Sequence, residues 1–185
     1  MSNINKERLN KVYALCDKID KNTKKQPTAR EQLRNGLSYF LMYLAASDGG
    51  ISWQRADFIS EIYEIPLTSN EIETIIKTIN QELDTCSLKF KEVVPPILKI
   101  FVGIDKHFNI KRKGPDALYC YRLLIILFEE MGIDLLHCNN DVTDKELHAL
   151  DFYLNNMRNY AIRELFGPEG DNNASDGTAF IGGKR

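Results

Sequence analysis

The chain has 185 residues, of which 43% are hydrophobic and 27% charged, and its net charge is −2 at pH 7. This composition is ordinary for one hydrophobic core, and the charge balance excludes a global field that would attract nucleic acid or an anionic membrane. No apolar stretch approaches the roughly 20 residues that span a bilayer, and the polar first residues lack the apolar segment of a signal peptide. We therefore expect a cytoplasmic protein with no membrane contact.

The first half of the chain opens with two predicted helices. Apolar residues recur at three- and four-residue steps over residues 6–21, so the first helix is amphipathic and covers the core. A capping box of Thr28 and Glu31 begins the second helix, whose apolar density rises until it ends near residues 48–50. We expect this second helix to be central.

Two shorter helices follow in the prediction. One opens at Ser52 and ends before Pro66, because proline lacks an amide hydrogen and crowds the preceding turn. Another starts at Thr68, with Glu71 as its capping glutamate. Its isoleucines lie at helical spacing, which outweighs their strand propensity.

The second half of the chain contains three more predicted helices. Pro95 and Pro96 divide the apolar stretch 88–108, because proline is well placed in the first turn of a new helix. The stretch 118–128 is apolar on most sides, which predicts the helix at the centre of the core. A capping box of Thr143 and Glu146 begins the last helix.

These elements predict an all-α fold: a single bundle of about seven to eight helices with an internal pseudo-repeat. The chain divides into an amino-terminal cover helix and linker (1–27), a helical domain (28–166) and a tail (167–185) whose composition is that of a linker or a disordered end. The four cysteines are scattered without a C-x-x-C motif, so we expect free buried thiols. They are Cys16, Cys86, Cys120 and Cys138.

The pseudo-repeat consists of two loops with the same order of residues. Residues 45–52 and 138–146 each follow an apolar helix, cross a polar turn, and restart with an aliphatic residue and a hydroxyl residue. That order is typical of a helix end, a turn, a hydrophobic staple and an N-cap. Capping explains the hydroxyl residues, so the acidic residues of these loops are the best candidates for a functional site.

The same residues resemble a known family. The segment 41–52, an alanine-rich helix ending in Asp-Gly-x-Ile-Ser, resembles the signature of the tellurite-resistance TerB-like family, and residues 139–146 resemble that family's second loop. The resemblance covers roughly residues 30–165. It implies an all-helical domain without catalytic activity, which serves as an interaction module in a bacterial stress-response or defence-associated system.

In some relatives the acidic loops are thought to bind a divalent cation, which is an alternative function: a metal-responsive sensor for calcium or magnesium. Hard cations require six or more oxygen ligands, so both loops would have to contribute. The alternative interpretation is that these acids only end or cap helices. Residues 53–55, Trp-Gln-Arg, depart from the family's acidic cluster. The candidate ligands are Asp48, Asp141, Asp144 and Glu146.

Two further groups are candidates for contacts with partners. Trp53 is either a core residue or an exposed anchor, since tryptophan is enriched at interface hot spots. In the tail, Phe180 and Ile181 belong to a small apolar segment that is a docking peptide, part of a linker, or only a terminus. We therefore expect another protein as the partner, while the sequence leaves the oligomeric state open.

A weaker alternative is nucleic-acid binding. The basic turn of Lys111, Arg112 and Lys113 has the charge to contact phosphates, but such clusters are usually solvated turns. The sequence contains no phosphate-binding loop, no nucleophile elbow and no zinc-ligand spacing. It therefore predicts a protein that is not an enzyme.

Overall fold

The computed structural model shows an all-α bundle, and it describes residues 3–47, 51–63, 68–74, 77, 94–108, 119–138 and 142–167. The all-α prediction is therefore confirmed over these residues. Residues 69–74 form a further helical turn, which begins at the predicted capping box of Thr68 and Glu71. The six principal helices are α1 (Asn3–Thr23), α2 (Ala29–Ala46), α3 (Trp53–Tyr63), α5 (Pro96–His107), α6 (Cys120–Leu136) and α7 (Asp144–Phe166).

Local sequence signals explain where these helices begin. The side chain of Thr28 accepts a hydrogen bond from the backbone amide of Glu31, and the Glu31 carboxylate accepts one from the Thr28 amide. These hydrogen bonds with Thr28 lower the pKa of Glu31. Pro96 is the first residue of α5, so the predicted helix start at the two prolines is confirmed. Residues 88–93, the other side of the predicted division, lie outside the described residues.

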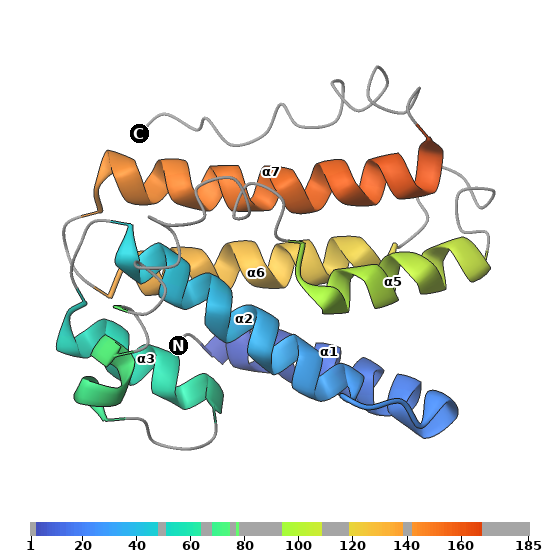
Figure 1. The fold of residues 1–185 in the computed structure, drawn as a ribbon, viewed down its shortest axis with the longest axis horizontal. Helices are drawn as coiled ribbons and strands as arrows, with labels where there is room; N and C mark the ends of the chain where they lie inside the picture. Colours follow the sequence, from blue (N-terminus) through green and yellow to red (C-terminus); the bar gives the residue numbers. More distant parts are fainter. Residues whose placement is uncertain are drawn as a thin grey trace.

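Helices α2 and α6 form the centre of the bundle, and each contacts all of the other five principal helices. Figure 1 shows α2 crossing the middle of the molecule between α3 and the group of α5, α6 and α7. Gly132 of α6 allows this close packing, because a Cβ there would lie 2.8 Å from Leu150 and 3.0 Å from Phe40. The prediction of two central helices is confirmed.

The amino-terminal helix α1 covers one side of this core. Its buried residues, Leu9, Val12, Tyr13 and Cys16, belong to the same hydrophobic cluster as the residues of α2 and α6. The carboxylate of Asp20 in α1 also accepts hydrogen bonds from the amides of Ala29 and Arg30. Helix α1 therefore contributes a cap to α2 as well as apolar contacts.

A second carboxylate acts in the same way between α5 and α6. Tyr119 precedes α6 but makes no side-chain cap. The buried Asp105 of α5 instead accepts hydrogen bonds from the amides of Cys120 and Tyr121, at 2.9 and 3.0 Å. The carboxyl end of α5 is thereby fixed against the amino end of α6.

Of the helices described, none combines the length and the apolarity that crossing a bilayer requires.

Candidate functional site

The ends of four helices meet at one end of the bundle, which we call the loop face. It is formed by the carboxyl ends of α2 and α6 and the amino ends of α3 and α7 (Figure 1). Both loops of the predicted pseudo-repeat lie here: one connects α2 to α3 and the other connects α6 to α7. Asp48 and Asp141, two of the candidate metal ligands, lie outside the described residues.

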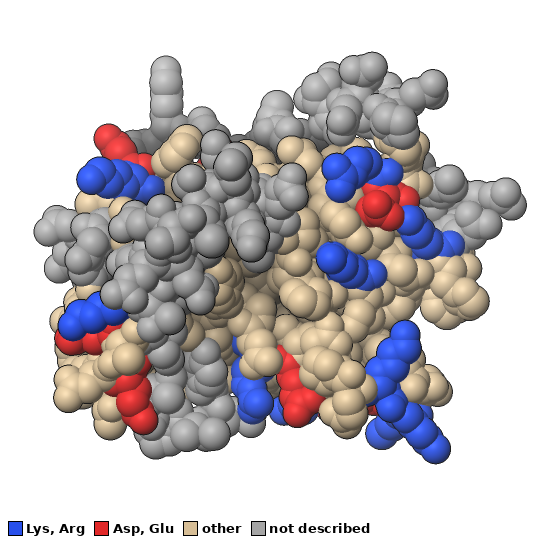
Figure 2. All heavy atoms as spheres, in the orientation of Figure 1, with Lys and Arg blue, Asp and Glu red and all other residues tan. Residues whose placement is uncertain are grey.

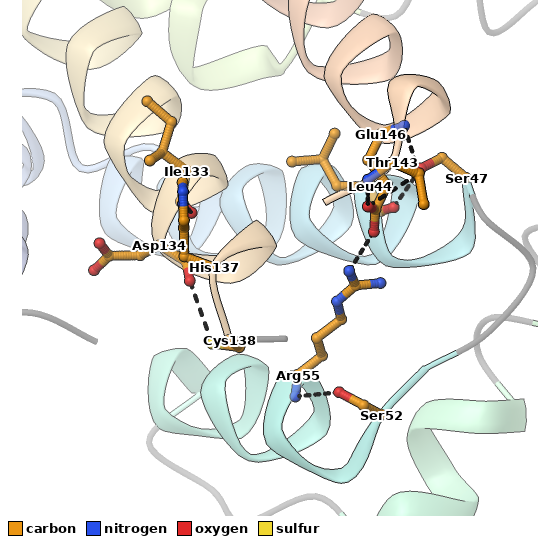
Figure 3. A network of polar contacts seen from close by, with 10 residues as sticks. All are labelled: Leu44, Ser47, Ser52, Arg55, Ile133, Asp134, His137, Cys138, Thr143 and Glu146. Carbon is orange, nitrogen blue, oxygen red and sulfur yellow. Dashed lines mark hydrogen bonds and ion pairs between the residues drawn. The ribbon is translucent and has the colours of Figure 1, made fainter. Parts of the chain in front are cut away.

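The centre of the loop face is a buried ion pair. Arg55 extends from the first turn of α3 toward Glu146 in the first turn of α7, and its guanidinium contacts the Glu146 carboxylate (Figure 3). The side chains are 1% and 0% exposed, so both charges lie inside the protein. Burying an ion costs several kcal/mol unless it is paired, and each of these charges therefore depends on the other.

Capping fixes both members of this pair. The Thr143 amide and hydroxyl both donate to Oε2 of Glu146, and the Thr143 hydroxyl accepts from the Glu146 amide. Across the loop face, the amide of Arg55 donates to the hydroxyl of Ser52 at 3.3 Å. The capping box at Thr143 is therefore confirmed, and one of its residues also joins two helices.

The sequence pattern held a signal for this pair that our sequence reasoning did not use. Arg55 and Glu146 each stand three residues after the hydroxyl residue that restarts a helix, so they occupy equivalent positions in the two loops. Opposite charges at equivalent positions of a pseudo-repeat are consistent with direct pairing. By the family resemblance alone, Arg55 is only a departure from an acidic cluster.

The predicted metal ligands on α7 differ in their exposure to solvent. Asp144 is exposed in the first turn of α7, while Glu146 is buried, with its carboxylate bound to Thr143 and Arg55. A cation at Glu146 would have to replace the guanidinium of Arg55. Within the described ranges, no three His, Cys, Asp or Glu side chains lie close enough together to hold a metal ion. A shared cation stays a prediction that depends on Asp48 and Asp141.

Trp53, the first residue of α3, is 71% exposed. The structure therefore removes the core interpretation of this tryptophan and leaves the anchor interpretation. The other predicted contact residues lie outside the described part of the chain, namely Phe180, Ile181, Lys111, Arg112 and Lys113.

The thiols in the described residues are free, as predicted, but only Cys16 is buried, while Cys120 and Cys138 are partly exposed. Cys86 lies outside the described ranges. Cys138, at the end of α6, donates through Sγ to the carbonyl oxygen of Asp134 at 3.3 Å, and desolvation raises its pKa. Burial likewise raises the pKa of Cys16 to about 12. These thiols are protonated near neutral pH, so they are poor nucleophiles.

The chemistry of the loop face is therefore that of a rigid, capped helix junction with one large exposed aromatic side chain. Its buried charges neutralise each other, and its hydroxyl groups are used for capping.

Comparison of the chain with protein-family models, with curated proteins and with solved structures gave no match.

Proposed function

We propose that this protein is a non-catalytic, TerB-like interaction module of a bacterial stress-response or defence-associated system, and that Trp53 anchors a partner protein on the loop face. The observation that carries the proposal is the exposure of Trp53 on the first turn of α3. A tryptophan offers a large apolar area, and leaving it in water is unfavourable unless a partner covers it.

The loop face supports this role because it is held rigid. Arg55, two residues after Trp53, is buried and paired with Glu146 of α7, so the first turn of α3 is fixed to a second helix. An anchor on a fixed element loses little conformational entropy when it binds. Preorganised aromatic anchors are typical of the residues that dominate the free energy of protein association.

The remaining support comes from the thiols and from the resemblance. The raised pKa values of Cys16 and Cys138 do not favour nucleophilic chemistry, which fits a binding role. The resemblance of residues 41–52 to the TerB-like signature supplies the proposed biological setting.

The test is a quantitative pull-down from lysate of the source organism, followed by affinity measurement with the recovered partner. We expect Trp53→Ala to weaken binding by about 30-fold, the effect of losing a hot-spot aromatic of about 2 kcal/mol. Ile126→Ala is the matched control, because Ile126 is a 40% exposed apolar side chain on α6 rather than at the loop face. Equal affinity of Trp53→Ala and wild type for every recovered protein contradicts the proposal.

A further inference from the structure

The end of the bundle opposite the loop face has a different chemistry. Here the carboxyl ends of α5 and α7 meet the amino end of α6 (Figure 1). Helix α7 has 23 residues and is therefore about 33 Å long, which separates this end from the loop face. We call it the basic end and define it by Lys106, Phe108, Arg122, Arg163 and Phe166.

The charge of the chain is unevenly distributed along the sequence, and Lys106, Phe108 and Arg122 of the basic end lie in its positive part. Three further cations of that part, Lys111, Arg112 and Lys113, lie outside the described residues. Residues 96–122, which contain α5 and the start of α6, have six lysines and arginines and two aspartates, a net charge of +4. The whole chain has a net charge of −2, so all other residues together carry −6. One of the two aspartates, Asp105, is buried against the amides that begin α6. Figure 2 shows basic side chains, with an acidic one between them, at the upper right over the carboxyl ends of α5 and α7, and further basic side chains lower on the same side.

The cationic side chains of this end differ in whether they already belong to an ion pair. Lys106 is paired with Glu164 at 2.6 Å, and this contact lowers the pKa of Glu164. Arg122 and Arg163 are exposed, and within the described residues neither belongs to an ion pair. Their guanidinium groups instead lie over the rings of Tyr119 and Tyr160, respectively. Arg122 also donates through Nε to the Tyr121 hydroxyl at 3.4 Å, and the charge of Arg163 helps to lower the pKa of Glu164. Neither contact is an ion pair within hydrogen-bond distance, so both guanidinium groups can still contact an anionic ligand.

Two exposed aromatic side chains lie at the same end of the bundle. Phe108 follows the last turn of α5 and is 60% exposed, and Phe166, the last residue of α7, is 41% exposed. The Phe166 ring packs edge-on against Tyr119, which is the ring beneath Arg122. Aromatic rings that alternate with cations favour unpaired bases, which stack on rings while arginines contact the phosphates.

From this arrangement we infer that the basic end binds single-stranded nucleic acid without strong sequence preference. Arg122 and Arg163 contact phosphates, and Phe108 and Phe166 provide surfaces for bases. An acidic polypeptide would satisfy the arginines but would leave the exposed phenylalanines without a stacking partner. This activity is independent of Trp53, which lies at the other end of the molecule.

The experiment is fluorescence anisotropy of a labelled oligouridylate of about 15 nucleotides, a length suited to a small single-strand site, with the full chain at several salt concentrations. We expect a dissociation constant in or below the micromolar range at low salt and a weaker one for duplex RNA of the same length. Phe108→Ala should weaken binding about tenfold, the loss of one stacking contact. Arg122→Glu should weaken binding similarly and reduce the salt slope by about 0.7.

Two controls separate the proposed site from effects of net charge and folding. Lys145→Glu makes the same charge change on exposed surface at the amino end of α7, and it should leave affinity within about twofold of wild type. Trp53→Ala should also bind normally, which distinguishes this site from the loop face. Glu164→Gln frees Lys106 from its ion pair and should strengthen binding about threefold.

Three results would overturn the inference. The first is a wild-type dissociation constant weaker than about 100 μM at low salt, which is the weak limit of non-specific binding. The second is an unchanged affinity in both Phe108→Ala and Arg122→Glu, with unchanged melting by circular dichroism. The third is equal displacement of the oligouridylate by polyglutamate together with an unaffected Phe108→Ala, which would assign the basic end to acidic proteins instead.

Discussion

At the scale of single residues, the pairing of Arg55 with Glu146 determines the chemistry of the loop face. The backbone amide of Arg55 and the side chain of Glu146 each take part in capping their own helix, and the ion pair connects α3 to α7. An isolated buried charge is far more costly than a neutral side chain of similar size. The two residues therefore stabilise the protein as a pair. Removal of either one leaves the other buried without its partner, which lowers the free energy of unfolding.

A double-mutant cycle measures this dependence. We expect Arg55→Met to lower the free energy of unfolding by about 3 kcal/mol, because it leaves the Glu146 carboxylate buried without its partner. Glu146→Gln should have a comparable effect by isolating Arg55. The double variant should recover most of the loss, since glutamine keeps the capping box while both charges are gone. Urea denaturation of the four proteins checks this, and additive losses in the double variant would contradict it.

At the scale of elements, two of the described helices are capped by carboxylates from elsewhere in the chain. Asp20 of α1 caps α2, and Asp105 of α5 caps α6, where the preceding Tyr119 provides no side-chain cap. A carboxylate near a helix amino end accepts hydrogen bonds from free amides and is favoured by the helix dipole. Such caps fix the orientation of one helix relative to another.

For Asp105, this argument gives a measurable expectation. Asp105→Ala should lower the free energy of unfolding by about 2 kcal/mol, because two amides of α6 lose their acceptor. Asp57→Ala is the control, since Asp57 is exposed on α3 and should change stability by less than about 0.5 kcal/mol. Thermal melts followed by circular dichroism compare the two. A loss in Asp105→Ala no larger than in the control would show that water replaces the carboxylate.

The element scale also separates what the sequence predicts from what it does not. The capping box of Thr143 and Glu146 could be predicted because its groups lie within four residues, and the same is true of the Pro96 helix start. The Asp105 cap has no local pattern, because it depends on how helices pack. The contact of Arg55 with Glu146 also depends on packing, and the sequence indicates it only through their equivalent positions in the two loops. The sequence likewise does not predict whether Trp53 is exposed or buried, because that also depends on how the helices pack.

At the scale of the whole molecule, one core crosses the expected boundary at residue 27. The buried residues of α1, including Cys16, belong to the cluster that α2 and α6 form. A helix that shares its apolar contacts with the main core unfolds together with that core. We therefore expect residues 3–23 to be part of the cooperative unit.

Thiol labelling tests this expectation. Cys16 is completely buried and its pKa is raised to about 12, so alkylation in the native state requires α1 to detach. Mass spectrometry of labelled peptides across a urea series should show Cys16 reacting only in the global unfolding transition. Cys138, which is partly exposed, should react earlier. Labelling of Cys16 at urea concentrations where the helical signal is still native would identify α1 as a separate unit.

The composition of the chain gives the loop face an optical property. Trp53 is the single tryptophan among 185 residues, and it stands in solvent at one end of the bundle. Its fluorescence spectrum is therefore a built-in local reporter: emission should begin near the water-exposed limit and shift to shorter wavelength when a partner covers the loop face. A ligand at the far end of α7 should leave that spectrum unchanged, so the emission of the unmodified protein shows whether a bound ligand covers the loop face.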